Sequence, residues 1–241
     1  MHTFNLRHLF HLLRFQIILT GLAALLPLCS HAQFQNMADH DDKPYYFGIT
    51  LGYNNANFKL FHSPQFLQSD SIAVVEPYGG KGFNMGLLGN LRLNRRFDLR
   101  FNPNLIFAEK NLKYLLKPDS STQIKYIESV LLSFPLQVKF KSDRIGNFRV
   151  YTLAGLKMDY DLSANSHSRQ QDDLVKLKRT DFGYEAGFGF EFYFPNFIFS
   201  PEIKLSNGFG NIYIPNKSNA YSNVIGKLLS RMIVISIHLE G

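Results

Sequence analysis

From Tyr45 onward the chain repeats one pattern, in which apolar and polar residues alternate before a group of turn residues. In the clearest run, Phe182 to Phe194, every even-numbered position is apolar or aromatic, and the odd-numbered positions are mainly Gly and Glu. Successive side chains of a strand point to opposite faces, so this spacing predicts a strand with one apolar and one polar face rather than a helix.

The same alternation recurs along the rest of the chain, for example in the runs 97–107, 130–140, 148–160 and 233–239. Eight strands are predicted, over residues 45–58, 82–94, 97–112, 122–141, 148–163, 177–194, 197–209 and 229–240. The connections alternate in length, as in barrels whose external loops are longer than their periplasmic turns. We expect the loops 59–81, 113–121, 164–176 and 210–228 to face outward.

This pattern predicts an all-β fold, an eight-stranded antiparallel up-and-down transmembrane β-barrel in an outer membrane. A soluble β-sandwich or a lipocalin-like barrel remains an alternative, because both also alternate faces. Those folds keep apolar side chains inside and charges outside. The predicted polar faces here have few charges per strand and are rich in Gly, Ser and Asn, which suit a narrow lumen, and the aromatic-rich apolar faces suit lipid.

The first residues have the form of a cleaved signal peptide. Arg7 and Arg14 precede the apolar run 17–26, and Ser30-His31-Ala32 has the small-x-small form of a cleavage site. A short retained membrane anchor is the alternative, although the run is short for a span. The expected organisation is a signal peptide at 1–32, a periplasmic linker at 33–44 and an outer-membrane barrel domain at 45–241.

Cysteine and charge narrow the choice of chemistry. The single cysteine, Cys29, lies within the expected signal peptide, and Leu28 before it argues against lipid attachment. The mature chain then has no disulfide, thiol nucleophile or thiolate metal site. It keeps 24 basic and 19 acidic residues, a net charge of +5. This mild excess would suit outer-membrane lipid and lipopolysaccharide as partners, whereas no nucleic-acid partner is expected.

The polar faces of the predicted strands have charged residues that would meet inside the barrel. An eight-stranded barrel has room for little more than side chains, and a charge confined there needs a partner. We therefore expect a plugged lumen with one charge network made by Arg92, Arg100, Lys139, Arg149, Lys157, Asp159, Asp161, Glu185, Glu191, Glu202 and Lys204. His238 is expected to be a satisfied lumen residue as well.

Aromatic residues beside the short turns are expected to form a girdle at the periplasmic interface. The predicted turns lie at 94–96, 142–147 and 195–196. The residues beside them that share one level are Phe97, Phe140, Phe148, Phe194 and Phe197.

Catalytic and cofactor motifs are weak in this sequence. A hydrolase site could be composed of Ser166, His167, Asp172 and Asp173. Any solvated external loop contains such residues, however, so a hydrophilic loop is the preferred interpretation. The glycines at 79–82 and 187–189 do not stand at a strand-to-helix turn, so they indicate no phosphate cradle. The acidic run 39–42 has the composition of a solvated linker and lacks a metal-ligand spacing. We expect no enzyme activity, no cofactor and no metal.

Five stretches can be compared with known families. They are 42–54, reading DKPYYFGITLGYN; 90–94, reading NLRLN; 97–107, reading FDLRFNPNLIF; 128–141, reading ESVLLSFPLQVKFK; and 142–155, which with the two residues that follow ends in RVYTLAGLK. These stretches resemble the PorT family of Bacteroidetes outer-membrane proteins. The chain departs from the family at Tyr45-Tyr46 and at its C-terminus, Leu239-Glu240-Gly241, which lacks a terminal aromatic residue.

The resemblance implies a role in the type IX secretion system, which carries folded cargo across the outer membrane in that phylum. It implies no catalytic residues. The expected function is therefore an assembly or accessory factor that contacts other secretion-system proteins. The alternatives are a generic small structural or adhesive barrel and, less favoured, a barrel hydrolase.

Overall fold

A computed structural model describes residues 35–64, 66, 72–117, 121–163, 176–215 and 224–241. Asn36–Gly241 form one compact unit, and Met1–Gln35 are a separate unit whose residues 1–34 lie outside the description. The expected signal peptide therefore lies outside the described residues. No helix within the described ranges is both long and apolar enough to cross a membrane.

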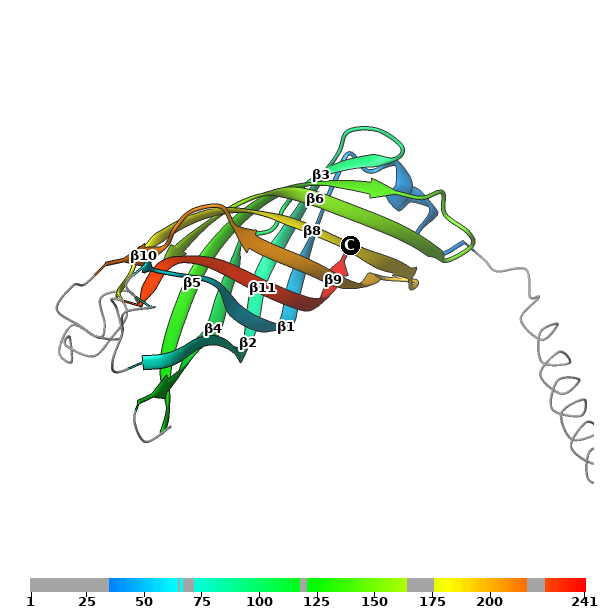
Figure 1. Ribbon diagram of the computed structural model, residues 1–241. Coiled ribbons are helices and arrows are strands. Elements are labelled where there is room, and N and C mark those ends of the chain that lie inside the picture. The colour runs from blue at the N-terminus through cyan, green and yellow to red at the C-terminus, as the bar shows by residue number, and fades with distance from the viewer. Residues whose placement is uncertain (1–34, 65, 67–71, 118–120, 164–175, 216–223) are drawn as a thin grey trace, which may run out of the picture. The chain divides into compact units, whose positions relative to one another are not determined.

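The compact unit is almost entirely antiparallel sheet (Figure 1). Its elements are η2 (Ala38–Asp42), β1 (Tyr45–His62), β2 (Ile72–Arg92), β3 (Phe97–Phe101), β4 (Asn104–Leu116), β5 (Thr122–Lys141), β6 (Phe148–Asp161), β7 (Lys176–Leu177), β8 (Thr180–Tyr193), β9 (Ile198–Gly208), β10 (Tyr213–Ile214) and β11 (Ile225–Glu240).

The sheet closes into a ring of eight strand positions. The order is β1-β2-β3/β4-β5-β6-β8-β9-β11, and β11 pairs back onto β1 from Gly48↔Glu240 to His62↔Ile225. β3 and β4 occupy one position because both pair with β2 and β5, and the break between them falls at Asn102 and Pro103. Closure removes the free sheet edges that hydrocarbon would not tolerate. The predicted up-and-down barrel is confirmed.

Local sequence explains the short turns at one end of the ring. Asn94 Oδ1 accepts hydrogen bonds from the backbone N–H groups of Arg96 and Phe97, each at 2.8 Å, and so closes the turn after β2. Gly146, between β5 and β6, has a φ of 59°, a left-handed conformation that glycine adopts without steric cost. These features fix the register of the hairpins.

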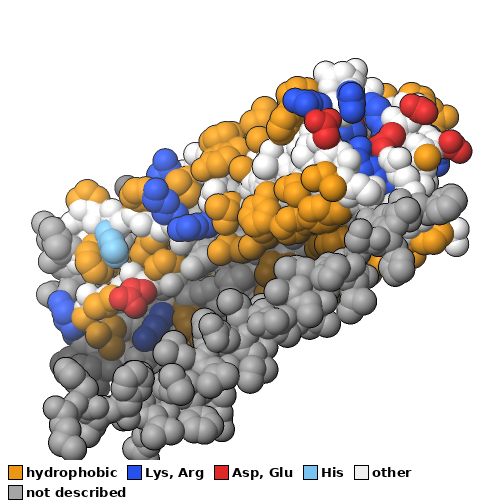
Figure 2. Space-filling model, turned by 90° about the vertical axis from the view of Figure 1, so that its right-hand side faces the viewer, with side chains coloured by type: hydrophobic (Ala, Val, Ile, Leu, Met, Phe, Trp, Pro, Cys, Tyr) orange, Lys and Arg blue, Asp and Glu red, His pale blue; other side chains and the backbone are white. Residues whose placement is uncertain are grey.

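The barrel is apolar outside and polar inside. In β8, Phe182, Tyr184 and Phe188 are exposed, whereas Asp181 and Glu185, on the other face of the strand, are buried. Figure 2 shows the outer apolar side chains as a band along one face of the molecule. A soluble sandwich or lipocalin-like barrel would have the reverse distribution. Apolar side chains outside, polar side chains inside and a closed ring of strands together are typical of an outer-membrane barrel.

The outward loops are shorter than predicted. Residues 59–81 were expected to be a loop, but β1 continues to His62 and β2 begins at Ile72. Pro77 and the glycines at 79–82 favour a turn by composition. The outer half of β2, Ile72–Gly79, nevertheless pairs with β4. Likewise β11 begins at Ile225, within the predicted loop 210–228. Most of the predicted loop 164–176 lies outside the described residues.

Candidate functional site

The strands place a dense set of charged side chains inside the barrel, and Arg100 lies at its centre. Arg100 Nη1 is 2.8 Å from Glu202 Oε2, and Arg100 Nη2 is 3.4 Å from Glu240 Oε1; all three side chains are fully buried. Its Nε donates to Asn90 Oδ1 at 2.9 Å, and the Tyr151 ring lies 5.2 Å away. The guanidinium thus connects β3 to β9 and β11 across the lumen.

A second buried cation, Lys139 on β5, lies in the same layer. Its ammonium group pairs with Glu191 of β8, is 3.8 Å from Glu240 and lies 4.1 Å from the centre of the Tyr151 ring. Gly189 makes room for that ring, because a Cβ at this position would lie 2.5 Å from the Tyr151 hydroxyl oxygen. Glycine on the polar face is therefore required by the packing of the lumen.

His238 of β11 completes this layer. Its Nε2 is 3.3 Å from Glu202 Oε2, and its Nδ1 is 2.9 Å from Thr50 Oγ1, which in turn donates to Asn102 Oδ1 at 3.1 Å. The side chain is completely buried. His238 therefore lies in the lumen as expected, with a hydrogen bond at Nδ1, whereas its Nε2 lies near Glu202 without a hydrogen bond among the described residues.

Toward the short turns, a further group surrounds Asp98 at the start of β3. Lys141 Nζ is 2.7 Å from Asp98 Oδ1, and the Tyr46 hydroxyl donates to Asp98 Oδ2 at 2.7 Å. All three residues are buried. This group closes the lumen on the side of β1 and β5.

Toward the outer end, the charges form two further groups. Glu185 accepts from Gln137 Nε2 at 2.6 Å and is 3.2 Å from Lys204 Nζ. Lys157 pairs with Asp159 two residues along β6, and Asp159 also accepts from Ser133 Oγ at 2.5 Å. Partners therefore come from strands β5, β6, β8 and β9.

The predicted charge residues thus lie in the lumen as separate groups of contacts rather than in a single chain of ion pairs. Two of them have no carboxylate or cation partner within the described ranges: Arg92 binds backbone carbonyls, and Asp161 accepts from Ser163 at 2.9 Å. Sequence reasoning left out the buried charged residues Asp98, Lys110, Lys141, Asp181 and Glu240. Asp98, Lys141 and Glu240 stand on the polar face of their strands, so the alternation itself could have identified them.

The chain before β1 closes the barrel at the end with the short turns. The expected solvated linker is wrong for His40 of η2, which is 2% exposed. Its ring lies 4.6 Å from the Tyr46 ring and 6.2 Å from the Tyr193 ring. Packing against these two aromatic rings holds η2 in place, although the composition of η2 is polar and does not predict such packing.

Three arginines hold this segment in place. Arg92 donates to the carbonyls of His40 and Asp41, and Arg149 Nη2 is 2.9 Å from Asp41 Oδ1. Arg144, in the turn between β5 and β6, donates to the Asn36 carbonyl and is 3.4 Å from Asp41 Oδ2. Residues 36–42, which we call the mouth segment, therefore bind the barrel through charge-assisted hydrogen bonds.

Burial changes the acid–base behaviour of the mouth segment. The pKa of His40 is lowered from 6.5 to about 4, first because burial disfavours the charged ring and then because Arg92 is nearby. Lys43 acts in the same direction, and Glu191 and Glu240 oppose it. His40 is consequently docked in its neutral form at neutral pH.

Four of the residues expected to form the girdle, Phe97, Phe140, Phe194 and Phe197, are exposed on the outer face. Phe97 and Phe140 face each other in register with ring centres 5.1 Å apart, and the Phe194 and Phe197 rings stack at 5.0 Å. Phe148 is half-buried against Phe192, at 5.3 Å. Their contact with the membrane interface stays a prediction.

The possible hydrolase residues Ser166, His167, Asp172 and Asp173 lie outside the described residues. Within the ranges that the structure describes, no group of three His, Cys, Asp or Glu side chains could hold a metal ion.

A closed ring with an apolar outside and a charged inside defines an outer-membrane β-barrel protein. Residues 32–213 match the family described as outer membrane protein beta-barrel domain, and the chain belongs to that family. Its location is therefore the outer membrane. No curated protein matches the chain at a significant level.

The chain is also similar to several solved structures. Neisserial surface protein A is 16% identical, with 80% of this chain and 95% of that chain covered and a TM-score of 0.39. OprG from Pseudomonas aeruginosa is 14% identical, with 82% and 95% covered and a TM-score of 0.40. Ail of Yersinia pestis, in complex with the heparin analogue sucrose octasulfate, is 13% identical, with 83% and 100% covered and a TM-score of 0.34.

Arg100→Leu should lower the free energy of unfolding by about 3–5 kcal/mol, because Glu202 loses its guanidinium partner and Glu240 keeps only Lys139, at 3.8 Å, while both stay buried. Urea titration of the protein folded in lipid vesicles, followed by gel mobility, measures this change. Arg96→Leu is the control, since it removes an exposed ion pair with Asp143 and should cost about 0.2–1 kcal/mol. Equal losses for the two variants would contradict the role assigned to burial.

The mouth segment should leave its site as the pH falls from 6.5 toward 4. Free His40 binds a proton near pH 6.5 and docked His40 only near pH 4, so docking is strongest above this window and weakens through it. A spin label on Asp39→Cys, in a protein prepared from residue 33 onward and therefore without Cys29, reports release as a narrower spectrum at pH 4.5 than at pH 7.

His40→Phe is the control for this experiment. It keeps an aromatic ring against Tyr46 and Tyr193 but cannot take up a proton, so its spectrum should stay unchanged between the two pH values. If the mouth segment of the His40→Phe variant were released with the same pH profile, release would not depend on His40, and the role assigned to His40 would be contradicted.

Proposed function

We propose that this protein is a closed, non-enzymatic outer-membrane barrel that acts through its surfaces and not as a pore. The observation that carries the proposal is the buried layer in which Arg100 and Lys139 meet Glu191, Glu202 and Glu240 across the lumen. A solute would have to break these pairs and leave charges unpaired in a confined space, which costs several kcal/mol. The mouth segment adds a second closure at one end.

A lumen of this size also argues against passage of a folded domain. Eight strands enclose a space just wide enough for side chains, whereas a domain of 100 residues has a radius of gyration of about 13 Å. Any part that the protein plays in moving folded cargo is therefore an assisting one. Its contacts would be made by the outer loops, the lipid-facing aromatic residues or the residues around the mouth segment.

The more specific role that we propose is an assembly or accessory factor of the type IX secretion system. The support is the resemblance of 42–54, 97–107, 128–141 and 142–155 to the PorT family, together with the closed lumen. Other secretion-system proteins would then be its partners. Outer-membrane lipid and lipopolysaccharide would surround the apolar band and the basic residues at its borders.

A structural or adhesive barrel is the second candidate, and the outer end of the molecule favours it. An apolar cluster extends the core there beyond the charged layers and packs the short β7–β10 sheet against the barrel. Its buried residues are Phe58, Ile72, Val75, Leu112, Tyr114, Ile212, Tyr213, Val224, Ile225 and Leu228. Such packing would make a rigid platform for a surface contact.

Deletion of the gene should leave the outer membrane intact and strand type IX cargo in the periplasm. Fractionation of cells followed by immunoblotting of a cargo protein measures the distribution. The intact gene should restore secretion, and so should a matched variant with Ser166, His167, Asp172 and Asp173 all replaced by Ala, because no catalytic role is assigned to them.

Normal secretion in the deletion strain would exclude the type IX role and leave the structural or adhesive barrel. An activity of the purified protein that is lost only in the alanine variant would replace both with the hydrolase.

A further inference from the structure

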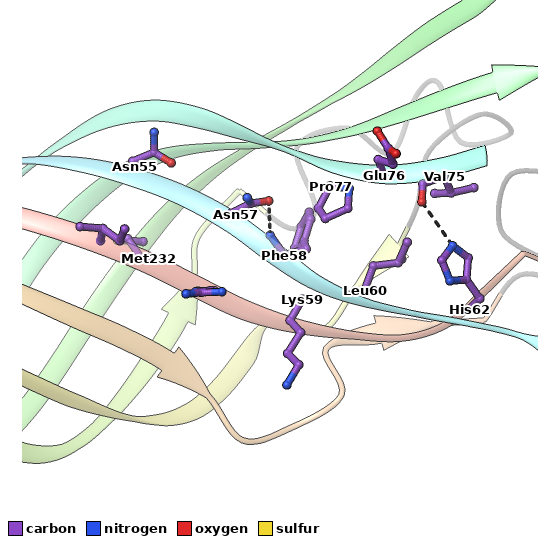
Figure 3. A pocket seen from close by; sticks show the side chains of 12 residues that line it. Asn55, Asn57, Phe58, Lys59, Leu60, His62, Val75, Glu76, Pro77 and Met232 are labelled. Carbon is purple, nitrogen blue, oxygen red and sulfur yellow. Dashed lines mark hydrogen bonds between the residues drawn. The ribbon is translucent and has the colours of Figure 1, made fainter.

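The barrel wall divides between β1 and β2 at its outer end. The two strands pair from Tyr45↔Leu91 to Ala56↔Gly80, and among the described residues no pairing between them continues beyond that point. Both strands nevertheless extend further. Residues 57–62 of β1 stay paired with β11, and 72–79 of β2 stay paired with β4. Two strand edges therefore face each other without a shared ladder (Figure 3).

Side chains satisfy part of these edges. Asn57 Oδ1 accepts the N–H of Phe58 at 2.8 Å, and His62 Nε2 lies 3.3 Å from the Val75 carbonyl, to which it donates. Pro77 on the β2 edge has no N–H to offer. An added β-strand would find its hydrogen-bonding groups partly occupied or missing, so this edge is protected against strand addition.

A cleft of about 500 Å³ lies at the division. Its lining combines residues that face into the barrel, such as Phe58 and Met232, with exposed residues of the outer face, such as Lys59 and Arg231. Figure 3 shows the β1 side chains of the lining spread on both sides of their strand. The cleft is thus lined from both faces of the wall, and its volume lies within the range of about 300–1,000 Å³ typical of small-molecule sites.

The cleft begins where the apolar outer face ends. Tyr53 and Phe83 form a cross-strand apolar pair, and the next outward pair along the same face is Asn55 with Lys81. Tyr45 to Tyr53 is about the length of strand that crosses the hydrocarbon core, so the following residues lie at the level of the headgroups. On β11 the outer face changes from apolar to charged between Ile233 and Arg231.

The charge at the rim is positive toward β11. Lys59 and Arg231 are exposed, and neither has a carboxylate partner in the ranges that the structure describes. Lys59 lies over the Phe61 ring at 5.4 Å. The acidic residue of the lining, Glu76, stands on the β2 side in register with Lys113 of β4. Lys59 of β1 and Arg231 of β11 therefore offer two cations without a described carboxylate partner to an anionic group.

We propose that this cleft binds a long-chain fatty acid. The alkyl chain would lie between β1 and β2 against Phe58, Leu60 and Val75, which belong to the outer apolar cluster or pack against it, and the carboxylate would meet Lys59 and Arg231. A phospholipid with its headgroup at this level would direct its chains into the bilayer, away from the cleft. A free single-chain acid fits because its chain can point outward. This site is independent of the secretion role.

Photocrosslinking of the full mature chain in lipid nanodiscs tests the site. A fatty acid with a diazirine at its chain end should label the segments 58–62 and 72–77, as mapped by mass spectrometry. Unlabelled oleate should compete, and oleyl alcohol, which lacks the charge, should not. The same diazirine within a phosphatidylglycerol chain should label the apolar band instead.

Paired variants give the quantitative readout. Lys59→Glu with Arg231→Glu should reduce cleft labelling at least tenfold, and Leu60→Trp, which fills the cleft, should reduce it as strongly. Arg95→Glu is the charge control, because this exposed residue lies at the opposite end of the barrel, and its labelling should match the unchanged protein. Heat-dependent gel mobility establishes that each variant is folded.

Four results would overturn the proposal. The first is labelling spread over exposed band residues such as Leu136 and Phe188 in the unchanged protein. The second is competition by oleyl alcohol as strong as that by oleate, and the third is stronger labelling of the cleft by the phospholipid probe than by the free acid. Folded Glu variants that are labelled at the unchanged level would equally exclude the assigned cations.

Discussion

The pairing of charges inside a narrow lumen is the interaction on which the rest of this structure depends. A barrel in hydrocarbon must place its apolar side chains outside, which leaves the polar ones to meet at the centre. There Arg100 can be accommodated only because Glu202 and Glu240 reach it from the opposite wall. The small residues of the polar face follow from the same constraint, since Gly189 leaves space for the Tyr151 ring beside these ions.

The alternation of side chains is sufficient to predict the strands that cross the membrane, because lipid outside and ions inside impose it at every position. Phe182 to Tyr193 is the clearest example. Where that constraint ends, prediction is weaker. The outer half of β2, with Pro77 and several glycines, follows no strict alternation, and its strand conformation depends on pairing with β4. The length of β2 could therefore not be predicted from the residues of β2 alone.

For the charged residues of the lumen, too, one part of the arrangement can be predicted from the sequence and another part cannot. Which residues face the lumen follows from their position along the strand, as for Glu191 and Lys204. Which residues pair depends on the register between strands that are distant in sequence, and no local pattern specifies it. The docking of His40 is the extreme case, since its site is built from Tyr46 and Tyr193, whereas its own neighbours in sequence are acidic and polar.

Membership of the outer membrane protein beta-barrel domain family establishes the fold and the location, and the closed lumen gives the proposed function its physical basis. The most direct test is the conductance of the purified protein in planar lipid bilayers. The account predicts no large steady current, both for the intact protein and for a variant that lacks residues 36–42, because the layer around Arg100 and Lys139 fills the lumen without the mouth segment. Reproducible open channels of porin size in the intact protein would contradict it.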